Sequence, residues 1–233
     1  MMRSLILIGM LFLAEVAFAA EESASLIAKV VNAYGGRDRL EATVALRETG
    51  KVEAATQIGR SGLLLRAFAR PLRLRSEIGD ENKGKEVRIL DGATGWRDGK
   101  AAAGPALQAM ILQAVRLDLP WQLLTHKDKV VEKPGVERQG KRLRVLEVPV
   151  ESNLTVTASI DPDTGHILYS CGTISGGPMG VMNFETAYED FRTVGGLLFA
   201  FKETNLASGT KTADTVLSSV EILKAAAEQE FRP

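Results

Sequence analysis

The sequence contains few of the residues that most often build disulfides and metal sites. It has one cysteine, Cys171, and two histidines, His126 and His166, in 233 residues. A single cysteine cannot form an internal disulfide, and in a strand-like context it is most simply a small buried hydrophobic residue. The two histidines belong to no HxxxH or HExxH motif, which argues against a histidine-based zinc site. We therefore expect neither a metal ion nor any other cofactor.

An excess of positive charge is also missing. The 29 Lys and Arg residues are balanced by 29 Asp and Glu residues, so the chain offers no electrostatic reason to bind nucleic acid. No Gly-Lys pair precedes Ser or Thr, which excludes a phosphate-binding P-loop. No serine lies in a Gly-x-Ser-x-Gly motif, and Glu189 and Asp190, as neighbours on a predicted strand, point to opposite faces. The sequence therefore predicts a protein that is not an enzyme.

Hydrophobic runs long enough to span a membrane are absent too. The apolar run from Leu5 to Leu13 covers about nine residues, whereas a spanning helix needs roughly 20. This run follows Arg3 and precedes Ala17-Phe18-Ala19, which is an A-x-A cleavage pattern. We predict a signal peptide over residues 1–19, cleaved after this motif, and a periplasmic mature chain over 20–233.

The mature region begins with helical patterns and then changes to the alternation of β-strands. Apolar residues between Leu26 and Tyr34 recur at helical spacing until Gly35 and Gly36 stop the pattern. From Val44 onward the period becomes two. In "LTVTASI" (154–160), for example, apolar and polar residues alternate strictly. Further strands are predicted at about 44–56, 60–69, 72–79, 85–91, 129–137, 141–150, 165–173, 182–192, 197–206 and 212–223.

One helical segment, 104–129, interrupts these strands. Pro105 suits the first turn of a helix, and Pro120 begins a second, shorter helix that contains Trp121. The first helix has a wide apolar face formed by Leu107, Met110, Ile111, Ala114, Val115 and Leu117.

About ten or eleven strands joined by short links predict one antiparallel sheet, and strand twist makes a sheet of this size curl. We expect a single α+β domain, mostly antiparallel β, whose helices cover the concave face and leave an apolar cavity.

Several stretches carry a resemblance to a known family. They are "YGGRDRLEA" before the first strand, "RPLRLRSEI" (70–78), the hairpin "DGATGW" (91–96), "YEDFRTVGGLLFAF" and the final "FRP". In order and spacing the mature chain resembles the LolA-like superfamily of exported lipoprotein carriers and outer-membrane lipoprotein-sorting proteins. The resemblance implies an incomplete, strongly curved β-barrel with a helical lid, which binds acyl chains in its concave cavity.

The resemblance also assigns roles to particular residues. An arginine that precedes a proline holds the family's lid, and the matching residue here is Arg70, before Pro71. Arg73 and Arg75 alternate with leucines and are expected on a solvated convex face. The residues expected to line the cavity and lid are Leu107, Met110, Ile111, Val115, Trp96 and Trp121.

The function implied by the resemblance is that of a periplasmic acyl-chain-binding carrier, which transfers a lipoprotein or lipid toward the outer membrane. Its expected partners are the acyl chains and the inner- and outer-membrane proteins that load and unload them. An alternative is a periplasmic lipid-sensing regulator, because fold alone does not separate carriage from sensing. An envelope hydrolase is less favoured. The sequence does not identify the cargo, the partners or the oligomeric state.

Overall fold

A computed structural model describes residues 21–56, 59–80, 84–150, 154–175 and 180–233. The signal peptide predicted over 1–19 lies outside these residues. Within the described ranges, no helix has the length and hydrophobicity required to cross a membrane.

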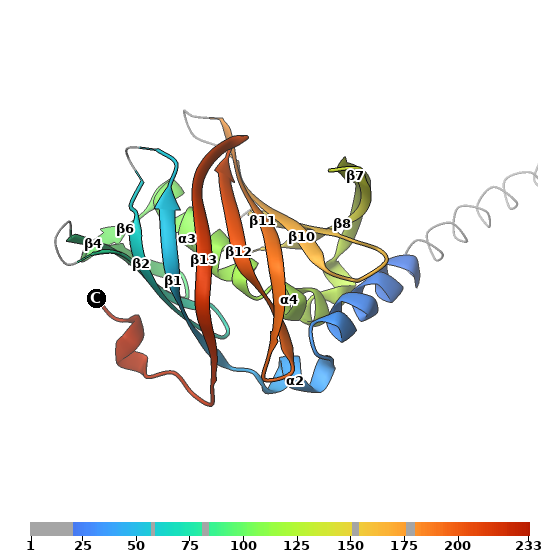
Figure 1. Cartoon of the computed structure of the whole chain (residues 1–233), viewed down its shortest axis with the longest axis horizontal. Helices are drawn as coiled ribbons and strands as arrows, with labels where there is room; N and C mark the ends of the chain where they lie inside the picture. Colours follow the sequence, from blue (N-terminus) through green and yellow to red (C-terminus); the bar gives the residue numbers. More distant parts are fainter. Residues whose placement is uncertain (1–20, 57–58, 81–83, 151–153, 176–179) are drawn as a thin grey trace, which may run out of the picture.

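All thirteen strands of the described chain belong to one antiparallel sheet (Figure 1). The strands are β1 (Ala45–Ala54), β2 (Gly62–Ala69), β3 (Arg73–Asp80), β4 (Gly84–Asp91), β5 (Thr94–Arg97), β6 (Lys100–Ala102), β7 (Val131–Arg138), β8 (Lys141–Pro149), β9 (Thr155–Ile160), β10 (Ile167–Ser175), β11 (Val181–Val194), β12 (Leu197–Ala207) and β13 (Thr210–Leu223). They lie in the order β6-β5-β4-β3-β2-β1-β13-β12-β11-β10-β9-β8-β7. The last strand pairs with the first, so the two meanders join in the middle of the sheet.

The predicted fold class is confirmed, with two more strands than expected. Each of the eleven runs expected from the sequence coincides with an observed strand. The additional strands, β5 and β6, contain only four and three residues, too few for a period of two to be recognised. In the part of the chain that the structure describes, β6 and β7 are edge strands that do not pair with each other, so the curled sheet is not a closed barrel.

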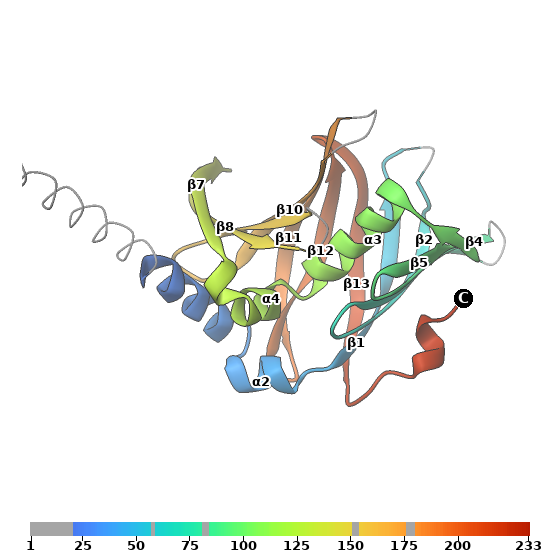
Figure 2. The same cartoon turned by 180° about the vertical axis from the view of Figure 1, so that it is seen from behind.

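Helices lie across the concave face of the sheet (Figure 2). A helix over 21–33 and α2 (Arg37–Ala42) precede β1, while α3 (Gly104–Leu117), α4 (Leu119–Thr125) and the short η1 (Lys127–Lys129) connect β6 to β7. The connection therefore runs from one edge of the sheet to the other. The 21–33 helix, α3 and α4 pack with β8, β9 and β10 in the largest apolar cluster. A second cluster joins α3 to β1, β2, β3 and β4.

Two glycines allow α3 to lie close to the sheet on both sides of the curl. A Cβ at Gly95 on β5 would lie 2.9 Å from the Leu107 side chain, and one at Gly172 on β10 would lie 2.9 Å from the Leu112 side chain. These distances are shorter than a carbon–carbon contact of about 3.5–4.0 Å. A larger residue at either position would therefore push the helix away from the strand.

The C-terminal segment covers part of the convex face. Phe231 of η2 (Glu228–Phe231) is buried in a cluster with Ala67, Ala69 and Ile89. The Arg73 guanidinium lies 5.2 Å from the Phe231 ring centroid, and Arg75 donates hydrogen bonds to backbone carbonyls of the same segment. Arg73 and Arg75 therefore lie on the convex side, but the expectation that this face is simply solvated was wrong, because the C-terminal segment packs on it.

Candidate functional site

Two cavities lie between the concave face and the helices. The apolar cavity, about 90 Å³, lies below the junction of α3 and α4 and is lined mainly by apolar residues, among them Leu46, Leu119, Ile167, Leu197 and Phe199. The polar cavity, about 320 Å³, lies on the other side of α3 and is lined by Arg66, Arg88, Arg116, Thr186, Glu203 and Asn205, among others. Arg116, Leu117, Tyr188 and Glu203 line both cavities. These four residues form the partition between an apolar and a polar chamber.

The residues expected to line the lid on α3 pack directly against the sheet. Met110 and Val115 are buried, in the second and first apolar clusters respectively. Leu107 packs against the second cluster and Ile111 against both. None of these four lines the apolar or the polar cavity. At these four positions the apolar face of α3 therefore packs on the strands, whereas Leu117 of the same face lines both cavities.

The two tryptophans lie in different places from those expected. Trp96 pairs with Ile89 on the neighbouring strand and packs against the cluster around Phe231 on the convex face. The expectation that Trp96 lines the cavity was wrong, because the register of the β4–β5 hairpin gives the concave position to Gly95. Trp121 lies on α4, where its ring stacks 4.5 Å from the Arg70 guanidinium.

Arg70 connects the sheet to the helices. Its Nε and Nη2 atoms each donate a hydrogen bond of 2.7 Å to the Asp118 carboxylate, which lies between α3 and α4. Its Nη1 atom donates to the backbone carbonyl of Leu40, near the end of α2. The side chains of Arg70 and Asp118 are only 10% and 7% exposed. Because Arg70 directly follows β2, a single side chain links the sheet wall to two helical elements.

Asp118 is the titratable group of this contact. Burial raises the pKa of its carboxyl from 3.8 to about 6, although the hydrogen bonds and charge of Arg70 act in the opposite direction. The carboxylate is ionised at neutral pH and gains a proton in mildly acidic solution. The bidentate ion pair with Arg70 therefore weakens as the pH falls through about 6.

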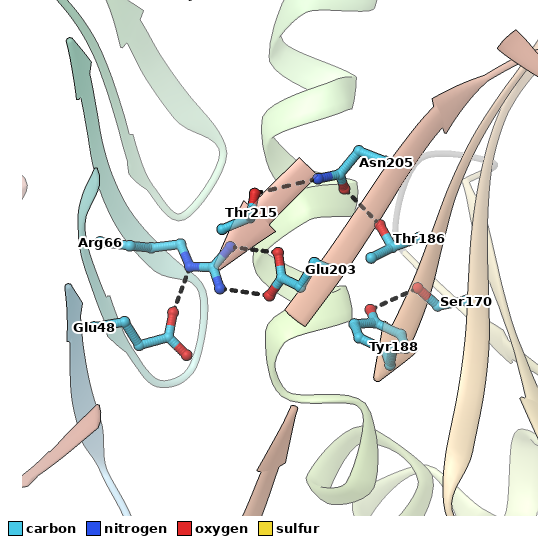
Figure 3. Close-up of polar contacts among 8 residues, drawn as sticks. All are labelled: Glu48, Arg66, Ser170, Thr186, Tyr188, Glu203, Asn205 and Thr215. Atoms are coloured by element: carbon cyan, nitrogen blue, oxygen red, sulfur yellow. Dashed lines mark hydrogen bonds and ion pairs between the residues drawn. The ribbon is translucent and has the colours of Figure 1, made fainter. Parts of the chain in front are cut away.

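A second arginine, Arg66, lies within a buried polar network on the concave wall (Figure 3). Its Nη2 and Nη1 atoms donate to the two Glu203 oxygens at 2.7 and 3.2 Å, and its Nε atom donates to Glu48. Burial disfavours the charge on Arg66, but the two carboxylates outweigh this effect and raise its pKa above the ordinary value. The network therefore ties β2 to β1 and β12 as a fixed set of charges.

Hydroxyl and amide groups extend this network along β10 to β13. Thr186 donates to Asn205 at 2.9 Å, Asn205 donates to Thr215 at 3.5 Å, and Ser170 and Tyr188 share a hydrogen bond of 2.7 Å. Figure 3 shows these side chains on neighbouring strands of the same wall. The concave wall is therefore polar over several strands, whereas the sequence analysis expected an apolar interior.

This network was not predicted, although the alternation of the sequence contains a signal for it. Glu48 follows Leu46 by two residues, and Arg66 lies between Leu64 and Phe68 at the same spacing. Glu203 likewise follows Phe201 by two. A period of two places each charged residue on the face of its apolar neighbours, and three such positions on different strands indicate paired charges in the interior.

The described residues hold no group of three or more His, Cys, Asp or Glu side chains suited to a metal ion. The lone thiol, Cys171, lies on β10, where burial raises its pKa. Because the thiolate is the reactive form, this shift makes Cys171 a poor nucleophile.

No protein-family sequence model matches the chain, and no curated protein sequence matches it either. Solved structures share its fold. A LolA superfamily protein from Nitrosomonas europaea superposes with a TM-score of 0.55 at 9% identity, over 91% of this chain and 97% of that one. A DUF1329 family protein from Desulfovibrio piger superposes with a TM-score of 0.49 at 9% identity, over 92% of this chain and 97% of that one. At this identity the superposition on the Nitrosomonas europaea protein shows the fold alone, and it confirms that the chain has a LolA-like fold.

Proposed function

We propose that this protein is a periplasmic carrier that shelters the acyl chains of a lipoprotein or another lipid in transit toward the outer membrane. The proposal rests mainly on one observation, the contact of Arg70 with Asp118 and the Leu40 carbonyl, which fastens the α3–α4 junction over the apolar cavity. A fastened lid over an apolar space suits a ligand that must be kept from water and later released.

The small volume of the apolar cavity indicates that the lid moves on loading. About 90 Å³ is well below the roughly 300–1,000 Å³ of a typical ligand pocket, and it is too little for a long acyl chain. When the lid lifts, the apolar face of α3 that now packs on the sheet becomes available to the chain. In this proposal Leu107, Met110, Ile111 and Val115 contact the cargo in the open state, while Trp121 packs beside the Arg70 latch.

The energies of latch and ligand are comparable. A hydrogen bond to a charged group contributes about 1.5–3 kcal/mol, and burial of acyl chain gains about 0.8 kcal/mol per methylene. A chain of ten or more methylenes therefore outweighs a latch of a few such bonds. The lid closes over the empty cavity without blocking the entry of a long chain.

The proposal also covers export, domain organisation and partner proteins. Residues 1–19 export the chain, residues 20–233 act as one lipid-binding domain, and inner- and outer-membrane proteins load and unload it. The proposal assigns the chain no catalytic role. Mass spectrometry of protein purified from its own periplasm tests this setting, because a carrier brings its lipoprotein or lipid along, whereas a stable regulatory partner without lipid would support a sensor instead.

The cavity itself is tested by binding of an environment-sensitive fatty-acid probe to the mature chain. We expect micromolar binding or better and displacement by long acyl chains. Phe199→Ser removes an apolar wall of the apolar cavity and should weaken the probe about tenfold, as expected for the loss of 1.4 kcal/mol or more of apolar burial.

Phe191→Ser is the matched control. Phe191 lies on the neighbouring strand, where its ring stacks 4.7 Å from that of His166, and it lines neither cavity. Its replacement should leave probe affinity unchanged. Absence of binding by any apolar probe at micromolar concentrations would contradict the carrier proposal.

A further inference from the structure

The polar cavity is poorly suited to the acyl chain of the proposed cargo. Arg66, Arg88 and Glu203 line it, together with the hydrogen-bonded row Thr186, Asn205 and Thr215 that the polar network of Figure 3 includes. Hydrocarbon placed against these groups would remove water from charged and hydroxyl side chains without replacing its hydrogen bonds, which is unfavourable. A ligand that occupies this cavity must therefore carry hydrogen-bonding groups of its own.

Most of the charges around the polar cavity are paired within the protein. Arg66 bonds to Glu48 and Glu203, which leaves that trio with one excess negative charge. Glu86 bonds to two arginines, Arg88 and Arg97, which leaves the second trio with one excess positive charge. The two trios together are neutral, so they offer no net attraction to a charged ligand.

Arg116 is a further positive charge on this wall, which Arg60 and Glu185 also line; Glu185 pairs with Arg138. Arg116 extends from α3 and donates one hydrogen bond of 2.6 Å, from Nη1 to the Phe184 carbonyl. Across the described ranges of the chain, no carboxylate lies within 4.0 Å of its guanidinium. A guanidinium has five N–H donors in a planar fork, so Arg116 retains donors for a ligand. Burial lowers the pKa of Arg116, although the charges of Tyr188 and Glu203 act in the opposite direction.

The position of Arg116 defines how a ligand would lie. It lines both cavities, and so does Leu117, the next residue on α3. The head end of an acyl chain that enters the apolar cavity would therefore lie at Arg116, while the rest of the tail lies against the apolar face of α3 that opening exposes. The rest of a headgroup would extend into the polar cavity. The polar cavity reaches outward to Ala54 and Thr212, near the ends of their strands, and to Gly59 in the connection between β1 and β2.

We infer that Arg116 binds the anionic group, a carboxylate or a phosphate, of an acyl amphiphile whose tail lies in the apolar cavity and whose headgroup lies in the polar cavity. The tail position rests on the proposed carrier function, and the anionic headgroup is the added claim. A planar guanidinium can donate two parallel hydrogen bonds to either oxyanion, and charge-assisted bonds of this kind are the strongest available at such a site.

The test compares ligands that share a chain and differ in the head. Palmitate, hexadecanol and palmitoyl lysophosphatidic acid are titrated against the bound fatty-acid probe, and inorganic phosphate is titrated alone as the headgroup without a tail. We expect palmitate and the lysophosphatidic acid to bind at least tenfold more tightly than hexadecanol. Inorganic phosphate alone should bind weakly and should not displace the probe, whereas displacement by phosphate alone would overturn the claim that the site requires an amphiphile.

Variants of Arg116 test whether this side chain causes the preference for anionic ligands. Arg116→Met keeps the length of the side chain and should abolish the preference for anions while leaving hexadecanol affinity within about twofold. Arg116→Lys keeps the charge and should restore part of the preference. The control is Gln113→Met, which changes an uncharged residue on the same helix and the same cavity wall and should leave the preference intact.

Two failures can be told apart. Equal affinity for palmitate and hexadecanol, with no effect of Arg116→Met, would overturn the anion site and leave the carrier proposal standing. Binding of none of the amphiphiles would overturn the carrier proposal and this inference together. If Arg116→Met does not fold, as judged by circular dichroism, the comparison of palmitate with hexadecanol in the unmodified chain decides, and equal affinity overturns the inference.

Discussion

Arg66 and Arg70 lie four residues apart along the chain, and each holds one carboxylate in bidentate geometry, yet they join different parts of the molecule. Arg66 lies on β2 and bonds only to strands, through Glu48 on β1 and Glu203 on β12. Arg70 lies just after β2 and bonds to Asp118 at the α3–α4 junction. The first contact is internal to the wall, and the second crosses from wall to lid. Breaking the Arg66 contact should therefore lower the stability of the sheet, whereas breaking the Arg70 contact should release the lid from the sheet.

The largest effect is expected at Arg66. Arg66→Met leaves Glu48 and Glu203 buried without their cation, and loss of one partner of a buried ion pair costs about 3–5 kcal/mol. We expect the free energy of unfolding in urea to fall by about this amount. The triple variant that also carries Glu48→Gln and Glu203→Gln removes the stranded charges and should recover most of the loss. A loss below about 1 kcal/mol in the single variant would mean that the network is solvated.

A smaller and more local effect is expected at Arg70. Arg70→Leu removes hydrogen bonds that exist only in the closed state, which shifts the lid equilibrium by about 1.5–3 kcal/mol, or roughly ten- to a hundredfold. Hydrogen exchange should accelerate in α3 and α4 while the amides of β1 remain protected. A bound acyl probe should also leave more slowly, because closure no longer competes with the ligand.

The matched control for Arg70 is an exposed ion pair. Lys202 bonds to Glu189 at 2.6 Å, and the two side chains are 45% and 52% exposed, so Lys202→Met should change stability by less than about 1 kcal/mol. Arg73 and Arg75 are unsuitable controls because both contact the C-terminal segment. If Arg70→Leu and Lys202→Met give the same exchange in α3 and the same probe off-rate, Arg70 does not hold the lid.

The smallest effect is the pH response of Asp118. In a Trp96→Phe background the remaining indole, Trp121, stacks on Arg70 and reports on this contact. Its fluorescence should change with a midpoint near pH 6, as Asp118 is protonated and the ion pair weakens. Asp118→Asn should remove the transition. A transition that persists in Asp118→Asn would show that Asp118 is not its source.

The free energy of unfolding should respond to protonation of Asp118 in the direction opposite to that of the lid contact. The pKa of this carboxyl in the folded state, about 6, lies above the unfolded value of 3.8. Its contribution to stability is therefore fully present below pH 3.8 and is lost as the pH rises through about 6. Acidification from pH 7 to 5 should weaken the contact between Asp118 and Arg70 and so loosen the lid. Over the same range, protonation of Asp118 should raise the free energy of unfolding. Comparing urea unfolding of the unmodified chain with that of Asp118→Asn at both pH values measures the contribution of Asp118 to the free energy of unfolding.

The strands were predictable because one face of the sheet is buried. In 154–160, for example, Leu154, Val156 and Ile160 are buried as the alternation requires. The position of Trp96 was not predictable in the same way. Its face depends on the four-residue turn from Asp91 to Thr94, and a shift of one residue in that hairpin would have placed the ring inside.

The candidate site was predictable only in part. Arg70 could be selected because the resemblance matches it to the family's arginine before a proline. Its carboxylate partner lies 48 residues further along the chain, and local patterns contain no information on that distance. The prediction of an apolar interior was wrong for a different reason. Apolar alternation was taken to mean an apolar wall, although Glu48 and Arg66 occupy positions of the same period.

The connection from β6 to β7 determines how the lid can move. At one end only Ala103 separates β6 from α3, and Gly104 begins the helix with a positive φ of 55°. At the other end lies Asp118, fastened by Arg70. A helix of 14 residues is about 21 Å long. In the proposed carrier, α3 is attached to the sheet through Ala103 and held by Arg70 at its other end. In the proposed carrier the lid rotates about Ala103 and opens widest beside Asp118, which lines the apolar cavity.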